Sequence, residues 1–194
     1  MDILRAHLSK YIKKIKTGQL SSSELTALEL PFYRKAIDFF FLTAGGTIQA
    51  SEAALKDGIC VHIGGGFHHA FPDHGEGFCV FNDIAVGIKK MLQINKIKKA
   101  LVIDCDLHQG NGTAYIFRND PDVFTFSIHE GDIYPFPKQQ SDLDIELPPN
   151  TSDKEYLSHL EQNIPEIINK HKPELIVYQS GTDPYESDQL GQLK

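Results

Sequence analysis

Two carboxylates and an imidazole stand at alternate positions directly after an apolar run in the middle of the chain. Asp104, Asp106 and His108 follow the run 100–103 and precede the glycine-containing stretch 110–112, a pattern typical of a buried strand that ends in a tight loop. If extended backbone continues to His108, all three side chains point to the same side. Such groups rarely share a buried site unless a metal ion or a proton relay compensates them. A surface loop is the alternative for this pattern alone.

Polar side chains also follow two other apolar runs. His68 and His69 come after the glycines 64–66 that close the run 59–63, and Asp183 follows the run 175–179. Glycines allow close backbone approach, so this segment can aim two neighbouring imidazoles into one pocket. The alternatives are a loop that happens to contain histidines and, for Asp183, a loop aspartate or a helix cap.

The elements that must position these residues alternate along the chain. Residues 1–57 are predicted to be largely helical, with a stop at 17–19, a capping pattern at 22–25 and a new helix after Gly45-Gly46. Beyond them we expect strands at 59–63, 100–104, 123–128, 144–147 and 175–179, and helices at 82–93, 113–117 and 152–170. This order predicts βαβ units around a parallel sheet, whose sites form at the carboxyl ends of the strands. The polar clusters then meet in one crevice.

The residues of that crevice indicate a metal-assisted hydrolase. Asp106, His108 and Asp183 supply two carboxylates and one imidazole, which leave open positions on a divalent ion, as catalytic sites do. Zinc is the first choice, and iron(II), cobalt or manganese also accept these ligands. The metal would polarise a carbonyl and activate water, while His68 and His69 exchange protons. The residues therefore predict hydrolysis of an amide or ester.

Composition limits the classes of protein to consider. The 194 residues are 41% hydrophobic and 23% charged, which predicts one globular domain over 1–194. A net charge of -7 argues against a nucleic-acid-binding surface. Cys60, Cys79 and Cys105 lie in or beside apolar runs without a C-x-x-C pair, so we expect reduced, buried thiols. No membrane span or signal peptide is recognisable, so we expect a cytoplasmic protein, or a nuclear one in a eukaryote.

Five motifs together resemble those of the histone deacetylase family. They match in order and spacing over residues 40–194, and the variant at 109–112 and the stretch around 45–47 are most similar to the class IV branch and its bacterial relatives. The motifs are Gly64–Ala70, Gly77–Asp83, Asp104–Gly112, Ser127–His129 and Ser180–Asp183. The resemblance implies a three-layer α/β/α fold of the arginase/deacetylase type with a mainly parallel sheet. It also implies removal of acyl groups from the ε-amine of lysine in proteins.

The resemblance assigns roles to the residues of the crevice. Asp106, His108 and Asp183 would bind one catalytic zinc ion, and His68 and His69 would be the general acid/base pair. Asp104 would hydrogen-bond to His68, and Asn111 to His69, which fixes the tautomers of both rings. Many class I members have aspartate where Asn111 stands, and the neutral amide should leave His69 less basic.

The resemblance also implies a substrate tunnel and a second cation site. Gly77, Phe78 and, by a looser match, Tyr134 would line the tunnel for the acylated lysine arm. A monovalent cation, usually potassium, would bind Asp104, Ser127 and backbone carbonyls near Asp106, His108 and Ile128.

Two departures from the family pattern leave other interpretations open. The family's transition-state tyrosine lies beyond the position of Lys194, and its first strand lies upstream of Met1, so we expect a partial or trimmed domain with weakened turnover. Tyr185 is close to the metal motif but is not that tyrosine. The alternatives are a deacylase of small acylated amines such as polyamines, a binuclear arginase-like hydrolase that also uses Asp188, and a non-catalytic chain that binds acyl-lysine.

Overall fold

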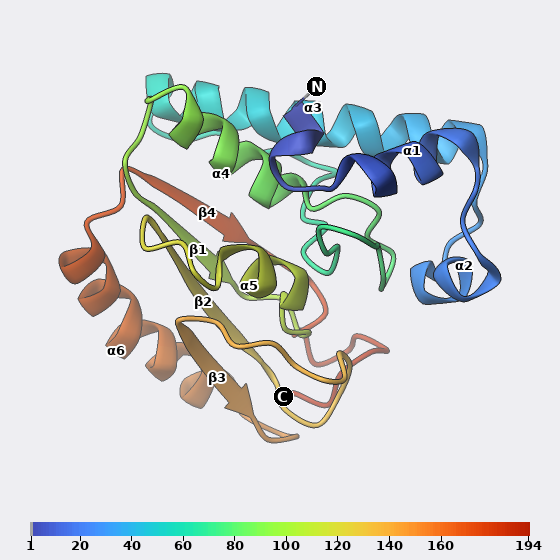
Figure 1. Cartoon of the computed structure of the whole chain (residues 1–194). Coiled ribbons are helices and arrows are strands. Elements are labelled where there is room, and N and C mark those ends of the chain that lie inside the picture. Colours follow the sequence, from blue (N-terminus) through green and yellow to red (C-terminus); the bar gives the residue numbers. More distant parts are fainter. Residues whose placement is uncertain (1) are drawn as a thin grey trace. The chain divides into compact units, whose positions relative to one another are not determined.

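The computed structural model describes residues 2–194. The chain divides into two compact units, one that ends at Ile97 and one that begins at Lys98. Helices make up the first unit, and the second combines a sheet with helices (Figure 1). Among the described residues, no helix has the length and apolar character needed to cross a membrane.

The first unit is built around two helices packed against each other, α3 and α4, with η1 against α4 (Figure 1). Most of α4 is buried, and Ala85, Val86 and Ile88 have no exposed surface. The elements of this unit are the 3-10 helix η1 (Asp2–Arg5) and the helices α1 (Ser9–Thr17), α2 (Ser22–Leu28), α3 (Arg34–Asp57) and α4 (Asp83–Gln93).

Local signals set the ends of the first helices as the sequence predicts. α1 stops at Gly18, whose φ of 69° is the left-handed conformation that glycine adopts without strain. α2 begins with a capping box in which the Ser21 hydroxyl accepts from the Glu24 amide and the Glu24 carboxylate accepts from the Ser21 amide. The N-cap residue is Ser21, one position before the capping pattern predicted at 22–25.

The predicted helix start after Gly45-Gly46 is wrong, because α3 runs without interruption from Arg34 to Asp57. Gly46 allows another segment of the chain to approach the helix closely, and it does not form a turn. A Cβ there would collide with the ring of His62, so the absence of a side chain lets the segment around His62 lie against the helix.

The second unit is a four-stranded parallel sheet with strand order β3-β2-β1-β4. This confirms the α/β class and the parallel sheet, and it is consistent with the arginase/deacetylase fold. Figure 1 shows α5 beside the sheet and α6 along it. The elements are β1 (Ala100–Asp104), α5 (Asn111–Phe117), β2 (Val123–Glu130), β3 (Leu143–Leu147), α6 (Asp153–His171) and β4 (Leu175–Gln179).

The core of the second unit lies between α6 and one face of the sheet. Leu101, Phe126, Ile128 and Leu147 are buried there, and α6 contributes Ile167. α6 itself begins with a second capping box, formed by Ser152 and Glu155. Burial of this face fixes the register of the strands and therefore the residues at their carboxyl ends.

The predicted strand 59–63 is absent. Its apolar side chains are exposed, at 80% for Ile59, 78% for Val61 and 95% for Ile63. Cys60 is exposed as well, so only Cys79 and Cys105 fit the prediction of buried thiols. A strand exists only where a neighbour accepts its ladder hydrogen bonds, and no described strand pairs with this segment. An apolar run alone cannot supply that neighbour.

Candidate metal centre and histidine pair

The candidate metal centre lies where β1 and β4 end side by side. The two strands are parallel neighbours with Asp104 opposite Gln179, and the Cys105 amide continues the ladder by donating to the Gln179 carbonyl at 3.0 Å. The loop after β1 carries Asp106 and His108, and the loop after β4 carries Asp183. The parallel register therefore brings residues 75 or more positions apart together at one edge of the sheet.

Asp106, His108 and Asp183 form a compact ligand cluster. One ligand atom from each residue lies within 4.8 Å of the other two. His108 Nδ1 is 3.0 Å from Asp183 Oδ2 and 3.3 Å from Asp106 Oδ1, and all three side chains are only 14–16% exposed. Two carboxylate oxygens and one imidazole nitrogen at these separations are a possible ligand set for a metal ion.

Charge inside the cluster is partly balanced by His108. Burial lowers the pKa of its imidazole, but hydrogen bonds and charge interactions with Asp106 and Asp183 outweigh burial and raise the pKa to about 9. A divalent ion binds neutral imidazole, so it would take the place of this proton between the same two carboxylates. The cluster thus has the charge and the geometry of a cation site.

Backbone amides hold the two carboxylates in place. The His108 amide donates to Asp106 Oδ1 at 2.9 Å, and the Leu107 amide donates to Asp183 Oδ1 at 3.1 Å. Such contacts orient the ligands before a metal binds. Asp188, the extra ligand of the binuclear alternative, does not belong to the cluster, which is the one group of its kind among residues 2–194.

The histidine pair belongs to the first unit. His68 and His69 are 4% and 6% exposed, and their ring centroids are 4.1 Å apart. They follow the glycine segment 64–66, in which Gly64 and Gly66 have φ values of 114° and 97°. The two rings therefore lie close together and buried, while their acid/base role remains a prediction.

The residues expected to orient the two imidazoles lie in the second unit. Asp104 and Asn111 are both 2% exposed. Asp104 accepts a hydrogen bond from the Asp106 amide at 3.1 Å, and Asn111 accepts one from the Gly112 amide at 3.0 Å. Their pairing with His68 and His69 remains a prediction.

The expected substrate and potassium residues lie in both units. Gly77 and Phe78 donate their backbone amides to the carbonyls of Ala27 and Leu28 at the end of α2, and the Phe78 ring is 51% exposed. In the second unit, Tyr134 lies with its ring centroid 6.1 Å from that of His108. Ser127 is opposite Asp104 in the β1–β2 ladder and bonds to His129, while Ile128 is fully buried.

Gln109 is a structural partner of this loop whose role the sequence analysis did not predict. Its side chain is buried and donates to the Gln139 carbonyl at 2.6 Å and to Asp144 at 2.8 Å, and it accepts from the Gln139 amide at 2.8 Å. Gln109 thereby ties the metal-ligand loop to the segment before β3. The signals in the sequence were its position next to a candidate ligand and its place in the variant motif 109–112.

The histone deacetylase domain profile matches residues 1–194, the whole chain. The chain belongs to the histone deacetylase family. Its relatives include an uncharacterised protein from Picosynechococcus, 37% identical over 96% of this chain and 62% of its own length. Histone deacetylase 2 of Arabidopsis thaliana is 32% identical over 100% of this chain and 52% of its own length. The acetoin utilization protein AcuC of Bacillus subtilis is 30% identical over 99% of this chain and 55% of its own length.

The chain spans between half and two thirds of the length of these three relatives. The metal cluster and the histidine pair both fall within the matched residues.

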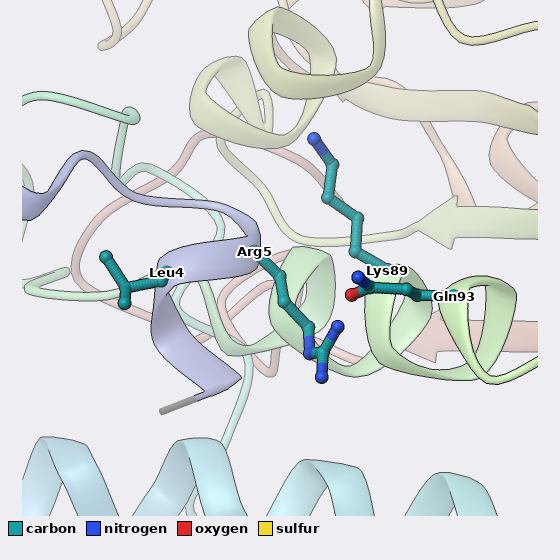
Figure 2. Close-up of a pocket in the computed structure, with 4 residues that line it drawn as sticks. All are labelled: Leu4, Arg5, Lys89 and Gln93. Atoms are coloured by element: carbon teal, nitrogen blue, oxygen red, sulfur yellow. The ribbon is translucent and has the colours of Figure 1, made fainter.

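A hollow on the first unit is separate from all of these residues. Leu4 and Arg5 of η1 and Lys89 and Gln93 of α4 line it, as Figure 2 shows. It contains none of the acid/base or ligand residues of the candidate site, so we assign it no role in the chemistry.

Proposed function

We propose that this chain is the metal-binding part of a zinc-dependent deacylase that removes acetyl or longer acyl groups from the ε-amine of lysine in proteins. The supporting observation is the cluster of Asp106, His108 and Asp183 in a chain of the histone deacetylase family. Two carboxylates and one imidazole leave coordination positions for substrate and water, which distinguishes a catalytic site from a structural one.

The proposed chemistry divides the work between the cluster and the histidine pair. A zinc ion held by Asp106, His108 and Asp183 would polarise the scissile carbonyl and lower the pKa of a water molecule. His68 and His69 take the proton from that water and return a proton to the lysine Nζ as the amide bond breaks. Asp104 and Asn111 orient the two imidazoles, and the neutral amide of Asn111 leaves His69 less basic than an aspartate at that position would.

The substrate in this proposal is an extended acyl-lysine side chain. The exposed ring of Phe78, the Gly77 backbone and Tyr134 pack along its aliphatic arm. Potassium bound by Asp104, Ser127 and carbonyls near Asp106, His108 and Ile128 would add positive charge behind the ligand loop.

The test is turnover of an acetyl-lysine peptide by the zinc-loaded chain, with bound metal counted in the same sample. We expect one zinc per chain and release of acetate, and we expect Asp106→Asn to abolish release while Asp188→Asn leaves it unchanged. Faster hydrolysis of an acetylated polyamine would favour the small-amine alternative. Peptide binding without turnover would favour a non-catalytic chain, and two bound manganese ions would favour the arginase-like reading.

A further inference from the structure

A residue in the first turn of α4 accepts hydrogen bonds from the backbone of the segment that carries the histidine pair. Asp83, which is 1% exposed, accepts hydrogen bonds from the Phe67 amide at 2.8 Å and from the Gly66 amide at 3.1 Å to each carboxylate oxygen. Its third donor is the hydroxyl of Thr47 on α3. Both amides belong to the two residues directly before His68.

Asn82 holds the same segment from its other end. Its side-chain amide donates to the carbonyls of His68 at 3.3 Å and Ala70 at 3.4 Å, while its side-chain oxygen caps α4 by accepting from Ala85 at 2.9 Å. Asn82 is fully buried. Two consecutive side chains therefore bind residues 66–70 through both donors and acceptors of their backbone.

The glycine segment is shaped to receive the Asp83 carboxylate. A Cβ at Gly65 would lie 2.5 Å from Asp83 Oδ2 and 2.9 Å from the Thr47 hydroxyl. Gly66, with a φ of 97°, turns its amide towards the same carboxylate. A buried carboxylate is costly unless donors satisfy it, and here three donors and the N-terminus of a helix do so.

We propose that Asp83 is a positioning residue for the acid/base pair. By fixing the Gly66 and Phe67 amides, its carboxylate sets the direction in which His68 and His69 leave the glycine segment and so holds their rings 4.1 Å apart. The catalytic consequence rests on the deacylase function proposed above, whereas the positioning itself does not.

The first measurement follows backbone amides in the full chain. Asp83→Asn replaces an acceptor oxygen by an NH₂ group that must face at least one of the two amides. We expect hydrogen exchange at Gly66 to become at least about tenfold faster, because either orientation of the new amide group takes away one of its two acceptor oxygens. Phe67 donates only to Oδ1, so its exchange becomes faster when the NH₂ group replaces that oxygen. The matched control is Asp153→Asn, which makes the same charge change at the same position of a capped helix, α6, at an exposed residue. Unchanged exchange at both amides in folded Asp83→Asn would overturn the proposal.

The second measurement separates positioning from folding. We expect Asp83→Asn to lower kcat by about tenfold or more, since small misplacements of catalytic groups can cost up to about a hundredfold. KM and bound zinc should stay at their wild-type values, because the metal ligands lie on other loops. A fall in zinc content that matches the fall in kcat would overturn the assignment.

If Asp83→Asn fails to fold, Thr47→Val is the variant that tests the proposal. It removes only the hydroxyl donor to the carboxylate, so a smaller change in the same direction is expected in amide exchange and in kcat. Absence of turnover in the wild-type chain would contradict the proposed function but not the positioning, which amide exchange decides alone. Normal exchange at Gly66 and Phe67 in Thr47→Val and in every folded Asp83 variant would contradict the positioning.

Discussion

Asp183 is the ligand whose role depends most on tertiary structure. It follows β4, 75 positions from His108, and yet accepts from the Leu107 amide and bonds to His108 Nδ1 at 3.0 Å. The Asp183 side chain thus connects the two loops and completes the proposed set of metal ligands.

At the scale of single residues, we expect Asp183→Ala to lose most of the bound zinc. The loss in affinity should exceed the roughly 10–100-fold that removal of an outer-shell partner typically costs. Metal analysis after dialysis measures it, with Asp188→Ala as the control on the same loop. His68→Ala and His69→Ala should keep the metal. Wild-type zinc content in Asp183→Ala would remove Asp183 from the ligand set, and metal loss in a histidine variant would make that histidine a ligand.

At the scale of elements, the start of α4 is anchored by a histidine from the other end of the first unit. His7 is buried beside Tyr11 and Phe81, and its Nε2 accepts from the Asn82 amide at 2.9 Å. Its Nδ1 lies 2.9 Å from the Phe71 carbonyl and must be the protonated nitrogen, because a carbonyl only accepts. Protonation of Nε2 would remove the acceptor of the Asn82 amide.

This arrangement predicts acid sensitivity of the first unit. Burial lowers the pKa of His7 to about 4, with the Phe71 hydrogen bond opposing and the charge of Lys89 adding to the effect. The unfolded chain, with an ordinary histidine pKa of about 6.5, binds the proton first, so this contribution to stability is full above pH 6.5 and is lost as the pH falls towards 4. We expect a loss of about 3 kcal/mol in the free energy of unfolding between pH 7 and 4.

The measurement is chemical unfolding of the wild type and His7→Gln across that pH range. The slope of stability against pH should decrease in His7→Gln and should not change in His159→Gln, the control on α6. An unchanged slope in His7→Gln would mean that other groups cause the acid sensitivity.

At the scale of the whole molecule, all three proposed metal ligands belong to the second unit, after the ends of β1 and β4. An ion that binds only the folded state stabilises it by mass action. At a free zinc concentration one hundred times the Kd, the gain is about 2.7 kcal/mol.

We therefore expect zinc to raise the free energy of unfolding and to slow amide exchange in β1 and β4. Unfolding with zinc and with a chelator measures the gain, and Asp183→Ala should abolish it. Cys60→Ser, which removes the exposed thiol, should leave the gain intact. An equal gain in Asp183→Ala would place the ion at another site.

Much of the second unit follows from the local sequence. The apolar runs at β1, β2 and β4 and the helical period of α6 predict these elements. Each element buries one face, and the apolar residues of that face recur at a regular spacing in the local sequence. The parallel sheet also follows, and with it the expectation that Asp106, His108 and Asp183 meet at one edge.

The first unit shows where such reasoning fails. The run 59–63 has the composition of a strand but is exposed, because a strand needs a pairing partner that the run cannot provide. Gly45-Gly46 looked like a helix boundary, yet it lies inside α3, where Gly46 makes room for His62.

The sequence by itself supplied the candidate residues of the site, because residue types and their nearness to the end of a strand are local properties. The extended backbone expected as far as His108 is not present, since β1 ends at Asp104 and residues 106–108 form bends. Only the tertiary structure decided what holds the candidate residues in place. Asp83 reaches the Gly66 and Phe67 amides, and Gln109 reaches Gln139 and Asp144, across distances in sequence that no local pattern encodes. Buried polar groups find whichever partners folding brings to them, and those partners are set by the packing of the whole unit.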